Sequence, residues 1–157
     1  MPFILSLFFR VFGERYIPFL LFQSFFGALV ASIMAWIGYK IGGRSLALLT
    51  GILIAVNTEL ISYSRMMLPK TIFSFLLSLI ALASMYLISH RNNIQFFLTG
   101  VLLGLAALCR PVAISWGILL AAILLVQKKY RLRVRLNVVL ALSIGYLLTM
   151  APWLIRN

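Results

Sequence analysis

Acidic residues are almost absent from this chain. Glu14 and Glu59 are the only acids in 157 residues, against fourteen lysines and arginines, which gives a formal net charge of +12. Charged residues make up 10% of the sequence and hydrophobic ones 64%, with a mean hydropathy of +1.11. Soluble domains are about 45–50% apolar and about 25% charged. The composition therefore predicts an integral membrane protein, and six spans of about 20 residues would leave no room for a soluble domain.

Cysteine and histidine are equally scarce. Cys109 is the only cysteine, which excludes an intrachain disulfide and a cysteine-based metal site; we interpret it as a small packed side chain. His90 is the only histidine, and we interpret it as an interfacial residue. A P-loop, a dinucleotide fingerprint, an H-E-x-x-H motif and a serine nucleophile elbow are also missing from the sequence. These absences argue against soluble-enzyme chemistry, and we expect no cofactor and no metal.

The cations are scattered between apolar stretches and form no continuous basic face. A nucleic-acid-binding protein would gather them on one surface. We therefore expect no nucleic acid as a partner. Membrane lipids and anionic lipid-linked substrates are the counter-ions that this pattern favours.

Six hydrophobic segments follow one another with short polar breaks between them. They cover residues 17–41, 46–61, 72–89, 96–109, 112–126 and 136–154. Turn residues occupy the breaks, such as Gly42-Gly43-Arg44, Pro69-Lys70 and Arg91-Asn92-Asn93. We therefore predict an all-α integral membrane fold with about six transmembrane helices, short loops and antiparallel neighbours, forming a single module over residues 1–157.

The N-terminal segment, residues 1–15, has no basic residue ahead of its apolar stretch, and that stretch is too short to span a bilayer. It matches neither a signal peptide nor an anchor. We predict an interfacial helix that precedes the first span.

Arg110 is the only charge in the apolar run 95–127, and Pro111 follows it directly. As one helix this run would be about 50 Å long, against about 30 Å for the hydrocarbon core of a bilayer. The run must therefore fold back, with Arg110 at the turn. A cation between two spans is first of all a functional hypothesis.

The distribution of lysine and arginine over the predicted loops sets the orientation. One side carries eight cations and the other six, and five of the eight lie in the single loop 127–135. Five clustered cations are hard to translocate, so we place this loop in the cytoplasm and the chain in the plasma (inner) membrane. The opposite, outer face then carries four cations and one acid. These are Arg65, Lys70, Arg110, Arg156 and Glu59.

Two interpretations of this outer cluster stay open. Arginine forks and a lysine charge can hold a phosphate or pyrophosphate whose lipid tail lies along the spans, as in a polyprenyl-phosphate sugar. Alternatively, each cation extends to a lipid headgroup, as long basic side chains near helix ends usually do. Glu59 is either a site residue or the hydrated end of a helix. Separately, Gly100 and Gly104 form a G-x-x-x-G pair, a spacing that allows two helices to approach closely.

Four stretches of the sequence carry a family resemblance. They are LLGLAALCRPV at residues 102–112, APWLIRN at 151–157, PFILSLFFRVFG at 2–13 and the Tyr63-Ser64-Arg65 step. Together they resemble the polytopic glycosyltransferases of the GT-C class, in the branch of the dolichyl-phosphate-mannose protein mannosyltransferases and the lipid A aminoarabinose transferases. The segment at 2–13 is similar to the juxtamembrane helix that such enzymes carry before their second span.

The resemblance implies transfer of a sugar from a polyprenyl phosphate to a lipid or protein acceptor on the extracytoplasmic side. An acidic residue in the first external loop would then act as base or position the acceptor. It also implies that Arg110 helps to hold the donor phosphate and that the outer loop after the second span, with Glu59, Tyr63 and Arg65, lines the cavity. Lys70 and Arg156 complete the predicted substrate-binding set, and no catalytic residue is assigned.

Two departures from the family pattern bear on activity. The chain begins inside what would be the first external loop, without the first span and its acid, and Lys70 stands about where relatives carry Asp or Glu. We therefore expect a truncated or split enzyme, inactive alone, with a possible partner chain that supplies the missing span. The alternative is a non-enzymatic polytopic protein, such as a lipid-binding, transport or assembly subunit, so the sequence leaves open whether the chain is an enzyme.

Overall fold

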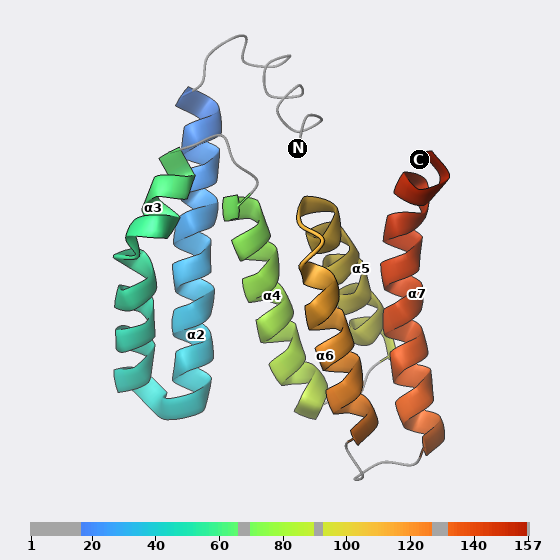
Figure 1. The fold of residues 1–157 in the computed structure, drawn as a ribbon. Helices are drawn as coiled ribbons and strands as arrows, with labels where there is room; N and C mark the ends of the chain where they lie inside the picture. The colour runs from blue at the N-terminus through green and yellow to red at the C-terminus, as the bar shows by residue number, and fades with distance from the viewer. Residues whose placement is uncertain (1–16, 66–69, 90–92, 127–131, 157) are drawn as a thin grey trace. The chain divides into compact units, whose positions relative to one another are not determined.

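A computed structural model of the chain describes residues 17–65, 70–89, 93–126 and 132–156. These residues form helices and no strand, so the predicted all-α fold is confirmed (Figure 1). The interfacial helix predicted over residues 1–15 lies outside the described residues. The helices are α2 (Ile17–Ala55), α3 (Thr58–Arg65), α4 (Lys70–Ser89), α5 (Asn93–Cys109), α6 (Ala113–Val126) and α7 (Leu132–Arg156).

The lengths and hydropathy of these helices are those of an integral membrane protein. Three described stretches are long and apolar enough to cross a bilayer: Ile17–Ala55, Lys70–Leu87 and Arg133–Trp153. The helices α5 and α6 are equally apolar but shorter, with 17 and 14 residues. A straight span needs about 20 residues, so α6 alone is shorter than the hydrocarbon core.

The contact pattern divides the chain into two compact units, Met1–Ser78 and Leu79–Asn157. Unit 1 contains α2, α3 and the first part of α4, and unit 2 contains the rest of α4 with α5, α6 and α7. Each unit is described by itself.

In unit 1, α2 is a helical hairpin. Gly42 and Gly43 have non-helical backbone angles, and Gly43 lies at φ 74°, ψ −161°, a region that essentially only glycine adopts. The two halves pack closely, because a Cβ atom on Gly38 would lie 3.0 Å from the carbonyl oxygen of Leu46. The hydroxyl of Thr50 donates to that same oxygen over 2.8 Å. The turn predicted at Gly42-Gly43-Arg44 is therefore confirmed.

The second half of α2 ends earlier than the expected segment 46–61, at Ala55, and a separate short helix follows. Asn57 causes the difference. Its side-chain oxygen accepts a hydrogen bond from the backbone N–H of Leu60 over 3.0 Å, as an N-cap residue does at the start of a helix. Glu59 then lies in the first turn of α3, where a negative charge is favourable.

The start of α4 packs on the first half of α2 within unit 1. The rings of Phe26 and Phe75 meet edge to face with centroids 4.7 Å apart, and Phe22 contacts Phe26 in the same way at 4.6 Å. Such pairs stabilise beyond the area they bury. Lys70, which opens α4, therefore lies at the same end of unit 1 as the beginning of α2.

In unit 2, α5 packs most extensively on α7. Glycines make this close approach possible: a Cβ atom on Gly100 would overlap the carbonyl oxygen of Leu142, and one on Gly145 would overlap that of Phe97. At Gly104, an added Cβ would lie 2.7 Å from the Cβ of Thr149. From the Gly100–Leu142 contact to the Gly104–Thr149 contact, residue numbers rise along both helices, so α5 and α7 run parallel. The predicted G-x-x-x-G close approach is confirmed, and α7 is its partner.

The helix α6 returns in the opposite direction and contacts both α5 and α7. Leu103 of α5 lies near Gly117 of α6, since a Cβ atom on Gly117 would be 3.7 Å from Leu103 Cδ1. Leu103 and Gly117 are each seven residues from Arg110 along the chain. The predicted reversal of the run 95–127 at Arg110 is thus confirmed.

Candidate functional site

Arg110 occupies the turn between α5 and α6. Its backbone N–H continues the helical pattern by donating to Ala106 over 2.8 Å, and its carbonyl accepts from the N–H of Ala113 over 3.1 Å. Pro111 permits only a fixed φ and has no N–H, so α5 ends at this point. The carbonyl of Pro111 accepts a hydrogen bond from the N–H of Ile114 over 3.0 Å. The backbone is therefore well fixed on both sides of Arg110, whose side chain is exposed.

A groove begins directly after this turn. It has a volume of about 290 Å³ and is lined by residues from three helices. They are Leu103 of α5, Ala113, Ile114, Gly117, Ile118 and Ala121 of α6, and Leu142, Ser143, Tyr146 and Leu147 of α7. On α6 the groove begins at Ala113, the first residue of the helix and three residues after Arg110, and extends to Ala121, roughly 12 Å at ~1.5 Å per residue.

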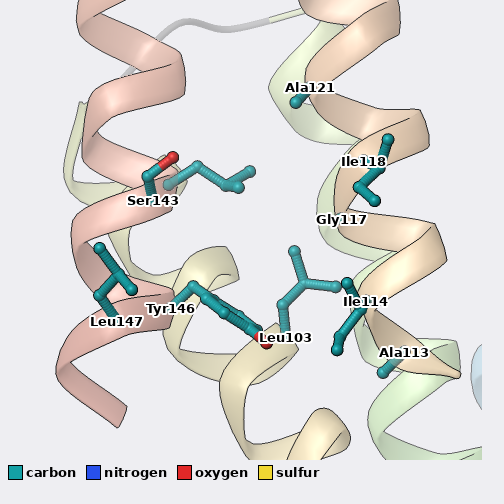
Figure 2. Close-up of a pocket in the computed structure, with 10 residues that line it drawn as sticks. Leu103, Ala113, Ile114, Gly117, Ile118, Ala121, Ser143, Tyr146 and Leu147 are labelled. Carbon is teal, nitrogen blue, oxygen red and sulfur yellow. The ribbon is translucent and has the colours of Figure 1, made fainter. Parts of the chain in front are cut away.

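The lining of the groove is apolar except for one turn of α7. Figure 2 shows Tyr146 reaching from α7 toward Ile114 on α6, with Leu103 of α5 beside it. Ser143 lies one turn before Tyr146 and adds a hydroxyl to the same wall. Two polar groups on an apolar wall are the usual composition of a small-molecule or lipid site.

Two further grooves of similar size lie elsewhere. One, of about 310 Å³, runs between α4 and α5, with Gln95 near the start of α5, the end away from Arg110. The other, also about 310 Å³, lies in unit 1 between Gly27 and Ala31 of α2 and Ile61 of α3. Of these three grooves, the α6–α7 groove has the lining residue nearest to Arg110 along the chain, Ala113.

The predicted residue Arg156 ends α7. Since α5 and α7 run parallel, the last residues of α7 and the turn at Arg110 lie at the same end of unit 2. Trp153, one turn earlier, is exposed and follows Pro152 within the helix. The structure therefore brings Arg110-Pro111 and the described part of the second motif, Pro152 to Arg156, to one end of the three-helix bundle.

The other predicted site residues belong to unit 1. Glu59, Tyr63 and Arg65 lie on α3, and Lys70 is the first residue of α4. Glu59 is exposed, whereas Lys70 is partly buried. The groove shared by α2 and α3 places α3 beside the beginning of α2, which is also the end at which α4 starts. The structure thus groups these four positions at one end of unit 1; their union with Arg110 and Arg156 in one site stays a prediction.

Ser143 and Tyr146 were not among the residues predicted from the sequence. Their only sequence signal is the spacing of two polar groups by three within an apolar helix, a pattern too common to single out a site. The lining residues of the groove extend from Leu103 to Leu147 in the chain, so only the packing of α5, α6 and α7 reveals the groove.

The fold and this groove define a polytopic membrane protein, helical over the described residues, with an apolar groove that begins three residues after a cation. Comparison with protein families identifies it further. The family model of dolichyl-phosphate-mannose-protein mannosyltransferase matches residues 1–155, and the chain belongs to that family. No curated protein matched the chain, and no solved structure did.

Proposed function

We propose that the chain forms part of a site that transfers a sugar from a polyprenyl-phosphate donor to a lipid or protein acceptor. The observation that carries this proposal is that Arg110 lies in the turn three residues before Ala113, where the lining of the α6–α7 groove begins on α6. A polyprenyl-phosphate sugar has an anionic phosphate at one end of a long apolar chain, and this corner of unit 2 offers a cation followed by an apolar channel. Membership of the mannosyltransferase family supports the same donor class.

In this proposal the guanidinium of Arg110 contacts the donor phosphate. The acceptor nucleophile attacks the anomeric carbon of the sugar, the bond from that carbon to the phosphate oxygen breaks, and the polyprenyl phosphate leaves with the bonding electron pair. A fixed cation stabilises the negative charge that grows on the departing phosphate. The rigid backbone on both sides of Arg110 limits the reorganisation needed during the reaction.

The isoprenoid chain then lies in the groove between α6 and α7. Gly117 and Ala121 leave space on the wall of α6, while Ser143 and Tyr146 supply the polar contacts on α7. Apolar burial contributes about 25 cal/mol per Å², so a groove of this size adds usefully to donor affinity. We assign no base among the described residues: Glu59 lies in the first turn of α3, where its charge complements the helix dipole without any substrate.

We propose further that the Arg110 turn faces the extracytoplasmic side of the plasma (inner) membrane. The five cations of residues 127–135 support this orientation, because they follow α6 at its opposite end. Lys70, Arg65 and Tyr63 would face the same side and contact the donor or acceptor from unit 1.

A photoreactive polyprenyl-phosphate sugar, added to membranes that contain the full chain, tests this proposal. We expect cross-links on α6 and α7, and we expect Arg110→Ala to reduce cross-linking and sugar transfer together, by roughly tenfold or more for the loss of a charge-assisted contact. Arg133→Ala is the matched control, because Arg133 is an exposed arginine at the far end of α7. Equal cross-linking in the Arg110 variant and the control would refute the phosphate role. Specific cross-linking without transfer would support the non-enzymatic lipid-binding alternative.

A further inference from the structure

Two aromatic rings and two cations gather at the turn of the α2 hairpin. We call Trp36, Tyr39, Lys40 and Arg44 the α2 turn cluster. The rings of Trp36 and Tyr39 are stacked, with centroids 5.9 Å apart and an interplanar angle of 29°. The ammonium of Lys40 lies 5.4 Å from the centroid of the Trp36 ring, a cation–π distance. Positions 36, 39 and 40 are one helical turn apart, so these side chains share one face of α2.

The cluster is open to its surroundings. Trp36 is 48% and Tyr39 45% exposed, and Lys40 and Arg44 are exposed as well. Gly43 leaves room next to them, because a Cβ atom there would meet nothing within 4 Å. The Lys40 ammonium, held against the Trp36 ring, has less conformational freedom than a lysine that moves among headgroups. It can therefore favour one kind of lipid headgroup.

The charge of the cluster is not balanced by any nearby acid. Residues 17–55 contain no Asp or Glu, and Glu59 lies on α3, at the end of unit 1 away from the α2 turn. Tryptophan and tyrosine settle at headgroup depth in a bilayer, and a Lys or Arg near an anionic surface attracts its lipids. Exposed Ile41, Leu48 and Ile52 on the same hairpin offer apolar surface for acyl chains.

We propose that the α2 turn cluster binds the phosphate of an anionic phospholipid, with Lys40 and Arg44 as the cations that contact it and Trp36 and Tyr39 as the rings that hold the headgroup at this depth. This surface is independent of the Arg110 groove and of sugar transfer. It gives the hairpin a selective lipid neighbour, in contrast to a cation that extends to whichever headgroup is closest.

Quenching of Trp36 fluorescence by brominated lipids tests the proposal. The chain has three tryptophans, so Trp116→Phe and Trp153→Phe leave Trp36 as the only one. In nanodiscs with equal fractions of brominated lipid, we expect brominated phosphatidylglycerol to quench Trp36 with an apparent association constant roughly five- to tenfold above that of brominated phosphatidylcholine. Lys40→Gln with Arg44→Gln should bring this ratio close to one.

Three comparisons keep the test decisive. Lys128→Gln with Lys129→Gln removes the same charge elsewhere and should leave the ratio unchanged; an equal loss there would mean that net charge alone acts, and would overturn the proposal. Lys40→Arg with Arg44→Lys retains both charges and should retain the preference, which guards against a folding artefact in the neutral variant. If inorganic phosphate at matched ionic strength abolishes the preference, the cluster is a free-anion site and the proposal fails. A ratio close to one in the parent protein would also overturn it.

Discussion

Arg135, near the start of α7, donates a hydrogen bond from Nη1 to the backbone carbonyl oxygen of Leu125 in the last turn of α6, over 2.8 Å. The last carbonyls of a helix have no partner within the helix, and a cation at this end also complements the helix dipole. Arg135 therefore connects α6 to α7 at the end opposite the Arg110 turn. Of the five cations between residues 127 and 135, at least this one has a structural role.

Arg135→Gln should lower the free energy of unfolding by about 1 kcal/mol, since a charged donor to a helix-end carbonyl is lost. Arg133→Gln removes the same charge two residues earlier, from an exposed side chain, and should change stability by less than about 0.5 kcal/mol. Denaturant titration in mixed micelles measures both values. Equal effects of the two substitutions would show that the loop charge matters and that the bond to Leu125 does not.

Gly100→Ala should destabilise the protein by about 1–3 kcal/mol, because the added Cβ would overlap the carbonyl oxygen of Leu142 and push α5 away from α7. Gly117→Ala is the matched control. Its Cβ would make an ordinary contact at 3.7 Å with Leu103, so the substitution should be neutral or slightly stabilising. Thermal unfolding of both variants in the same detergent is the measurement. A Gly100 variant as stable as the control would disprove close α5–α7 packing.

The breaks between helices could be read from the sequence because each depends on local chemistry. Gly42-Gly43 and Arg110-Pro111 interrupt the helical pattern through glycine freedom and proline restriction, and the structure has a break at both, whereas Pro69 lies outside the described residues. The short helix α3 was not predicted. Asn57 lies inside the predicted segment 46–61, and hydropathy alone does not show that one helix ends before it and another begins after it.

Which helices pack against each other could not be predicted from the sequence, for a different reason. The pair Gly100 and Gly104 predicts a close helix neighbour, but its identity depends on matching small positions in another helix, here Gly145 of α7. The α6–α7 groove depends on the same choice. Within the predicted site, the position of Arg110 follows from unit 2 alone. The combined site of six residues needs both units and remains a prediction.

Asn57→Ala should weaken α3 selectively. The side-chain oxygen of Asn57 satisfies the Leu60 N–H, and loss of an N-cap costs about 1 kcal/mol. Amide hydrogen exchange over residues 58–65 should become several-fold faster, while exchange in α5 should stay unchanged. Thr58→Ala, at the first residue of the helix, should have a smaller effect. Unchanged protection of α3 in the Asn57 variant would mean that tertiary contacts, and not the cap, hold this helix.

Gly117→Phe should block the α6–α7 groove and reduce binding of a polyprenyl-phosphate sugar by roughly tenfold, which corresponds to about 1.4 kcal/mol. The ring would occupy the space between α6 and α7 at the level of Leu103, while Gly100 and Gly145, which allow α5 to approach α7, do not line the groove. Ile144→Phe adds a ring to an exposed position of α7 that does not line the groove, and it should bind the donor normally. A filter assay with labelled donor compares the two variants. Because Arg110 remains in place in both, a loss confined to Gly117→Phe assigns the isoprenoid chain to this groove, and normal binding by that variant would place the chain elsewhere.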